Sequence, residues 1–158
     1  MNNSLRLPEF LRLFPDDTAC LEAIKMLRFP NSIRCSICNK ITKHYKIKSR
    51  TAYACKLCRN HVFPLADTIF EKTTTSLQLW FYAMLLMTYT RAEISAKQLQ
   101  RELGVTYKTA WRMHKTIRTL MEQNDGDLLH HEKETIRKWT FFNKFEIKVV
   151  ERQQANND

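Results

Sequence analysis

Glycine is almost absent from this sequence of 158 residues, which contains only Gly104 and Gly126. Phosphate-binding loops and dinucleotide-binding turns need several glycines close together, so both are excluded. Long hydrophobic runs are also missing, because the longest, residues 77–89, is interrupted by Gln78 and Thr88 and a membrane span needs about 20 apolar residues. The N-terminus lacks the apolar stretch and cleavage site of a secretion signal. We therefore expect a cytoplasmic protein with no membrane partner.

Carboxylates are missing from residues 34–59, a segment that contains eight basic residues: Arg34, Lys40, Lys43, Lys46, Lys48, Arg50, Lys56 and Arg59. In the whole chain, 26 Lys and Arg residues exceed 16 Asp and Glu residues and give a formal net charge of +10. Such an excess favours a polyanionic partner, with nucleic acid as the first choice and an anionic membrane surface as the second.

Four of the five cysteines form two Cys-x-x-Cys pairs, Cys35 with Cys38 and Cys55 with Cys58, separated by sixteen residues. This spacing is typical of zinc sites, because each short turn brings two sulfurs together and two turns complete a tetrahedron. A closed four-sulfur site has no open position for water, so we expect one structural Zn²⁺ that supplies folding energy to a small module. An iron–sulfur cluster is the alternative metal, and Cys20 is expected in the core.

The pattern along the chain predicts an α+β protein, with a small β zinc ribbon followed by an all-α helix-turn-helix bundle. We divide the chain into a helical lead (residues 1–30), a zinc ribbon (31–70), a helix-turn-helix domain (71–122) and a C-terminal tail without an assigned structure (123–158). Short strands are expected over residues 44–48, 51–54 and 61–63. In the tail, residues 130–139 are compatible with a helix and residues 145–150 with a strand.

Residues 94–113 have the pattern of a helix-turn-helix. Ser95 is expected to cap its first helix with Gln98 as capping-box partner, and Gly104 to end it. Thr106 is then expected to cap a helix that extends to about residue 122.

The second of these helices divides into two faces at about 100° per residue. Basic and polar residues occupy one stripe: Lys108, Arg112, Lys115 and Thr119. Apolar residues occupy the opposite side: Ala110, Met113, Ile117, Leu120 and Met121. A helix that reads the major groove needs this division, although an ordinary solvated helix face is the alternative. Trp80, Phe81 and Trp111 are expected in the core.

The candidate DNA-binding residues follow from these two patterns. They are Thr106, Tyr107, Lys108, Thr109, Arg112, Lys115 and Arg118 in the helix and Lys46, Lys48 and Arg50 in the ribbon. We expect Arg112 to contact guanine, and Lys115 and Arg118 to contact phosphates.

These residues together resemble the N-terminal DNA-binding region of bacterial insertion-sequence transposases, over roughly residues 14–122. The resemblance is carried by Phe14-Pro15, Leu27-Arg28-Phe29-Pro30, the two cysteine pairs, Asp67-Thr68-Ile69-Phe70-Glu71, Trp80-Phe81 with Ser95-Ala96, and the run from Glu102 to Met113. In that family an RNase-H-like catalytic domain follows, in which three carboxylates hold two divalent metal ions for phosphoryl transfer.

The 36 residues after Glu122 are too few for such a domain, because a two-metal site needs carboxylates from several elements of a sizeable scaffold. We therefore expect a transposase-derived, nucleoid-associated protein that binds double-stranded DNA, is not an enzyme and has no small-molecule substrate. It would regulate transcription, bind transposon ends or act beside a partner protein or as a homo-oligomer. The alternatives are a truncated or split transposase with a catalytic partner chain, and a zinc-ribbon module that binds RNA or protein.

Overall fold

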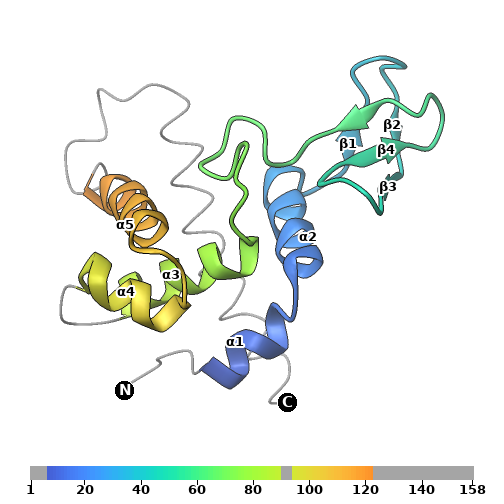
Figure 1. Ribbon diagram of the computed structural model, residues 1–158. Coiled ribbons are helices and arrows are strands. Elements are labelled where there is room, and N and C mark those ends of the chain that lie inside the picture. The colour runs from blue at the N-terminus through green and yellow to red at the C-terminus, as the bar shows by residue number, and fades with distance from the viewer. Residues whose placement is uncertain (1–6, 90–93, 123–158) are drawn as a thin grey trace.

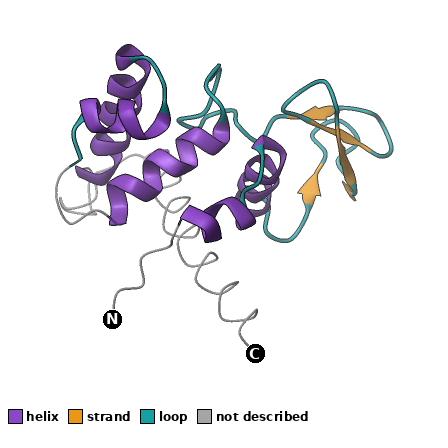
Figure 2. Ribbon diagram, turned by 60° about the horizontal axis from the view of Figure 1, so that its bottom comes forward, coloured by secondary structure: helices purple, strands orange, loops and turns teal. Residues whose placement is uncertain are grey.

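A computed structural model describes residues 7–89 and 94–122, and it has the predicted α+β architecture. In chain order the elements are α1 (Leu7–Leu13), α2 (Asp17–Arg28), β1 (Ile33–Arg34), β2 (Ile41–Thr42), β3 (His44–Lys46), β4 (Tyr53–Cys55), β5 (His61–Val62), α3 (Leu77–Tyr89), α4 (Ala96–Leu103) and α5 (Tyr107–Glu122). The strands gather at one end of the molecule and α2 lies between them and the remaining helices (Figures 1 and 2).

The strands form two small antiparallel sheets, β1–β2 and β3–β4–β5. The three strands expected from the sequence are confirmed as β3, β4 and β5. The pair β1–β2 was not foreseen, because strands of two residues are too short to show an alternating pattern. The predicted helix over residues 130–139 and strand over 145–150 lie outside the described residues.

Helix α2 begins after Asp16, whose carboxylate caps it by accepting a hydrogen bond of 2.8 Å from the backbone N–H of Ala19. Its buried face contains Cys20, Leu21, Ile24 and Leu27. Cys20 is fully buried, so its assignment to the core is confirmed.

Helix α3 is the apolar segment of residues 77–89 and packs at the centre of the core. Its N-terminus is capped from a distance: one carboxylate oxygen of Asp17 accepts hydrogen bonds from the Ser76 hydroxyl (2.5 Å) and the Gln78 N–H (3.0 Å). Phe81 is fully buried and its ring meets that of Phe14 edge-on at 5.2 Å. The helical lead and α3 therefore form one hydrophobic core.

Helices α4 and α5 are joined by a short turn at residues 104–106. Ser95 and Gln98 form the predicted capping box at the start of α4, and Gly104 ends that helix with a positive φ of 65°. The Thr106 hydroxyl accepts from the Thr109 N–H at the start of α5 (3.3 Å). These three sequence predictions are confirmed, and His114 adds a ring-nitrogen contact of 2.8 Å to the Ile94 carbonyl.

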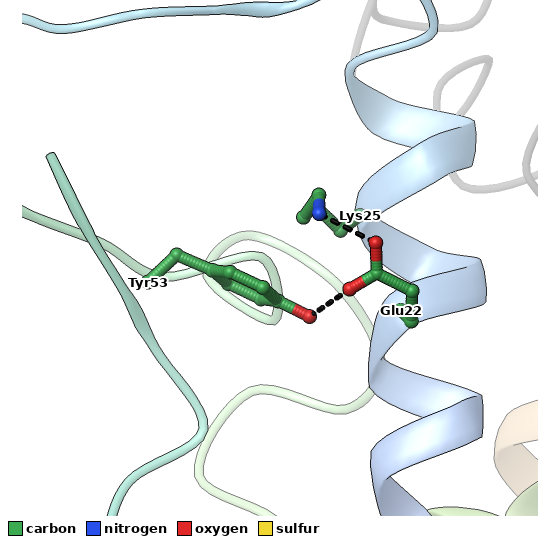
Figure 3. A network of polar contacts seen from close by, with 3 residues as sticks. All are labelled: Glu22, Lys25 and Tyr53. Atoms are coloured by element: carbon green, nitrogen blue, oxygen red, sulfur yellow. Dashed lines mark hydrogen bonds and ion pairs between the residues drawn. The ribbon is translucent and has the colours of Figure 1, made fainter. Parts of the chain in front are cut away.

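The β region (residues 33–62) is joined to α2 by a partly buried polar contact (Figure 3). Tyr53 of β4 is 1% exposed, and its hydroxyl donates a 2.6 Å hydrogen bond to Glu22. Lys25 lies over the Tyr53 ring and forms an ion pair with Glu22. Arg28 adds two bonds, to the carbonyls of Pro64 (2.6 Å) and Ala66 (2.7 Å). Since Tyr53 also belongs to the main hydrophobic cluster, the sheets are anchored to the helical core.

Candidate metal centre and nucleic-acid interface

The two cysteine pairs adopt the same backbone geometry. In the first turn the Cys35 N–H donates to the Lys40 carbonyl (3.0 Å), and in the second the Cys55 N–H donates to the Asn60 carbonyl (2.8 Å). The residue after each pair, Asn39 or Arg59, has a positive φ, of 54° and 62° respectively. This left-handed residue reverses the chain directly after the second sulfur of each pair. Both turns therefore present their thiols in the same way.

The four sulfurs of Cys35, Cys38, Cys55 and Cys58 lie within 4.8 Å of one another. Across the two turns, the sulfur of Cys35 is 3.3 Å from that of Cys58, and the sulfur of Cys38 is 3.8 Å from that of Cys55. A tetrahedral ion with bonds of about 2.3 Å to sulfur places its ligands about 3.8 Å apart. The donor set and its spacing fit one structural Zn²⁺, as predicted from the sequence.

The pKa values of two of these thiols are shifted in opposite directions. The backbone N–H of Cys38, followed by that of Ile37, lowers the pKa of the Cys35 thiol to about 6. At Cys58 the N–H of Asn60 lowers the pKa, but the neighbouring Cys35 sulfur and burial outweigh it and raise the pKa to about 11. Four adjacent thiols cannot all ionise without a cation between them. The cluster therefore favours a divalent ion, which deprotonates its thiol ligands.

Helix α5 has one buried face and one exposed face. Ala110, Met113 and Ile117 are buried, whereas Lys108, Arg112, Lys115 and Thr119 are exposed, as predicted. Leu120 and Met121 were also expected on the apolar face. In the last turns of the helix Leu120 is half-buried and Met121 is exposed, so this expectation is only partly correct.

Trp111 was expected in the core, and this prediction is wrong: its side chain is 48% exposed. Trp111 lies one residue, or about 100°, beyond the buried Ala110 and therefore falls on the cationic side of α5. The ammonium of Lys115 lies 5.1 Å from the centre of its ring. The other two aromatic residues predicted in the core, Trp80 and Phe81, are buried.

Several candidate DNA-binding side chains already have partners within the protein. One terminal nitrogen of Arg112 donates to the Thr75 hydroxyl (3.0 Å), which lies in the segment before α3. Arg118 forms an ion pair with Glu122 (2.7 Å). The hydroxyls of Thr106 and Thr109 are 3.0 Å apart. Tyr107 is exposed at the start of the helix.

The three ribbon candidates occupy different surroundings. Lys48 and Arg50 are exposed in the loop between β3 and β4, whereas Lys46 is half-buried. Lys46 is paired with Tyr53 in the sheet register, so it lies on the face that turns toward α2. His44 lies on the same face and is half-buried, whereas His61 is exposed.

Comparison with known families agrees with this metal centre. Residues 15–61 match the family model of the transposase zinc-ribbon domain. This segment is therefore similar to a transposase zinc ribbon. The match includes α2, which the Tyr53–Glu22 bond joins to the strands. The resemblance stated from the sequence is confirmed for these residues, and zinc is favoured over an iron–sulfur cluster.

A longer relative extends the similarity beyond the zinc ribbon. An uncharacterized protein in transposable element ISH50 of Halobacterium salinarum is 27% identical over 104 residues, which are 65% of this chain. The matched stretch is 35% of the relative's own length. No solved structure matches the chain. Among the described residues, no helix combines the length and apolar character needed to cross a membrane.

Proposed function

We propose that this protein is a transposase-derived, zinc-binding DNA-binding protein, which recognises double-stranded DNA through a helix-turn-helix formed by α4 and α5. The observation that carries the proposal is the division of α5 into a buried apolar face and an exposed cationic face. A recognition helix needs apolar packing behind it and hydrogen-bond donors in front. The unit of residues 94–122 supports this with six basic residues against Glu102 and Glu122.

The DNA contacts assigned to residues of α5 differ with their position along the helix. The N-terminal end of the recognition helix contacts base edges in the major groove. At the start of α5 these residues are Thr106, Tyr107, Lys108 and Thr109. Arg112 contacts guanine, while Lys115 and Arg118 contact phosphates. Trp111 joins this surface because its ring is exposed beside Lys115.

The zinc ribbon adds phosphate contacts of its own. Lys48 and Arg50 are exposed in the loop between β3 and β4, and we assign the half-buried Lys46 to the same role. The zinc ion has a structural role, since four thiolates leave no position open for a reacting water. Within residues 7–89 and 94–122, these cysteines are the group of side chains close enough together to hold a metal. We therefore assign DNA binding, and not strand transfer, to the described residues.

The test begins with selection of a preferred duplex from a randomised library by the zinc-loaded protein, followed by fluorescence anisotropy. Arg112→Ala is expected to weaken binding to the selected duplex by about 1–3 kcal/mol and to relax base preference at one position. Lys115→Gln should weaken all duplexes alike and reduce the salt dependence by about one phosphate contact.

The matched control is Thr75→Val, which removes the intramolecular acceptor of Arg112 and leaves the guanidinium in place. This variant should bind DNA as the wild type does. If Arg112→Ala leaves the preference among duplexes unchanged, or if Thr75→Val has the same effect as Arg112→Ala, the recognition role assigned to α5 is wrong.

The length of the ISH50 relative favours one second candidate, in which this chain is the DNA-binding part of a split transposase that acts with a catalytic partner chain. Strand-cleavage assays with Mg²⁺, with and without the products of neighbouring genes, separate the two functions. Chromatin immunoprecipitation would distinguish occupancy of transposon ends from occupancy of promoters by a nucleoid-associated regulator.

A further inference from the structure

The outer face of the three-stranded sheet exposes aromatic rings in a single row. The register pairs Tyr45 of β3 with Ala54 of β4, and Ala54 with His61 of β5. Because side chains alternate along strands, these three residues share one face. Phe63 follows on the same side, and its ring lies 6.2 Å from that of His61. We call Tyr45, Ala54, His61 and Phe63 the aromatic row.

This row lies on the sheet face opposite the one that contacts α2. On the opposite face Tyr53 and Cys55 are buried, and the Tyr53 hydroxyl reaches Glu22 of α2. By contrast, Tyr45 is 55% exposed and Phe63 is 48% exposed. Leaving such rings in water forgoes the burial that stabilises aromatic side chains. The exposure of neighbouring rings on one sheet face therefore marks an interaction surface.

Positive charge borders the aromatic row. Continuing the register by one residue pairs Lys43 with Lys56, and the Lys56 N–H donates to the Lys43 carbonyl (3.0 Å). Both lysines are exposed on the same face as Tyr45, and neither forms an ion pair within the residues that the structure describes. The sequence has no carboxylate between Glu22 and Asp67. Protein-binding surfaces are depleted in lysine, so the charge favours a polyanion.

The combination of rings and cations is that of a surface for unpaired bases. Single-stranded nucleic acid binds where aromatic side chains stack on successive bases and a cationic border follows the backbone. Tyr45 and His61 are separated by one intervening strand, or about 10 Å. Ala54 between them has only a methyl group and leaves both rings accessible. Bases in an intact duplex are stacked on each other and cannot use such a row.

We propose that the aromatic row of the zinc ribbon binds single-stranded DNA, with Tyr45 and His61 stacking on unpaired bases and Lys43 and Lys56 contacting phosphates. The choice of DNA over RNA rests on the proposed function, whereas the stacking surface itself does not. The row would hold a strand that opens near the duplex bound by α5.

The test uses the full, zinc-loaded chain and a short fluorescein-labelled oligothymidylate in anisotropy titrations. Tyr45→Ala should weaken binding between about fivefold and about a hundredfold, the range for loss of one base–aromatic stack. Tyr45→Phe keeps the ring and should bind like the wild type, whereas Tyr45→Leu keeps the apolar character without the ring and should bind like the alanine variant. One zinc ion per chain in each variant confirms that the ribbon is folded.

The controls separate this surface from the duplex site. Ile41→Ala removes an equally exposed apolar side chain from the other sheet and should leave oligothymidylate binding unchanged. Tyr45→Ala should retain the selected duplex, and Trp111→Ala should retain the oligothymidylate. Equal losses for the single strand and the duplex in Tyr45→Ala, no loss in either, or binding of oligouridylate in place of oligothymidylate would overturn the proposal. If variants of α5 change only duplex binding and keep oligothymidylate binding, the result concerns the proposed function and leaves the single-strand proposal standing.

Discussion

The bond between Tyr53 and Glu22 gives the sharpest test of how the zinc ribbon is held to the helices. Tyr53→Phe removes one hydroxyl and leaves the buried ring under Lys25. A hydrogen bond to a charged group contributes about 1.5–3 kcal/mol. The Glu22 side chain is 42% exposed and keeps its ion pair with Lys25, so water can replace the lost donor. We therefore expect the free energy of unfolding to fall by about 1.5 kcal/mol.

The assay is urea unfolding of the zinc-loaded protein, followed by circular dichroism and by zinc release to a chromogenic chelator. With a urea slope of about 1–3 kcal/mol per molar, the midpoint should fall by about 0.5–1.5 M. Both signals should move together, because Tyr53 belongs to the same hydrophobic cluster as the helices.

The stabilisation from the Tyr53–Glu22 bond depends on pH in a direction that follows from the pKa values of the two groups. Burial, and then the Glu22 carboxylate, raise the pKa of Tyr53 above its ordinary value. The stabilisation is therefore complete below the ordinary tyrosine pKa of about 10 and is lost as pH rises through the raised value. Burial opposes ionisation of Glu22, but the bonds from Lys25 and Tyr53 lower its pKa overall. Its contribution is present above the ordinary pKa and is lost as pH falls through the lowered one.

Glu22→Gln is the matched control, because it keeps an oxygen acceptor for Tyr53 and removes the charge. The double variant Glu22→Gln/Tyr53→Phe should lose less free energy of unfolding than the sum of the losses in the two single variants. A Tyr53→Phe variant within about 0.3 kcal/mol of the wild type, or a helical transition that does not shift with zinc release, would refute the reasoning.

The remaining predictions concern the metal, the buried thiol and the turn. Zinc removal by a strong chelator should unfold the ribbon, because structural zinc supplies about 10–16 kcal/mol; a native amide spectrum in the chelator would contradict this. Burial, with Asp17 and Asp16 nearby, raises the pKa of Cys20 to about 12, so in the zinc-loaded protein Cys20 should react with a thiol reagent only after denaturant is added, whereas chelation should make the four ligand thiols reactive. Gly104→Ala should cost about 1 kcal/mol, and Gly104→Asn less, because φ is positive and no atom lies within 4 Å of an added Cβ; equal losses in thermal unfolding would point to a different cause.

Local chemistry explains the features that could be predicted without a structure. The cysteine spacing predicts the metal site because each turn is complete within a few residues. Ser95 predicts a helix start because its capping partner, Gln98, lies three residues away. The apolar run 77–89 lies within the segment expected to be all-α, and its composition leaves no polar face.

Contacts between distant segments required the tertiary structure. Asp17 caps a helix about 60 residues away, and Glu22 binds Tyr53 across 31 residues, and neither pairing leaves a periodic signal in the sequence. The prediction for Trp111 was wrong because this residue lies next to the buried face of α5. The sequence does not show how wide that face is, since its width depends on how the neighbouring helices pack against it. The aromatic row emerged only when the register brought Tyr45 and His61 together. The sequence by itself thus determined the metal ligands, the limits of α4 and α5 and the basic character, while the packing of distant segments decided which rings and charges reach the surface.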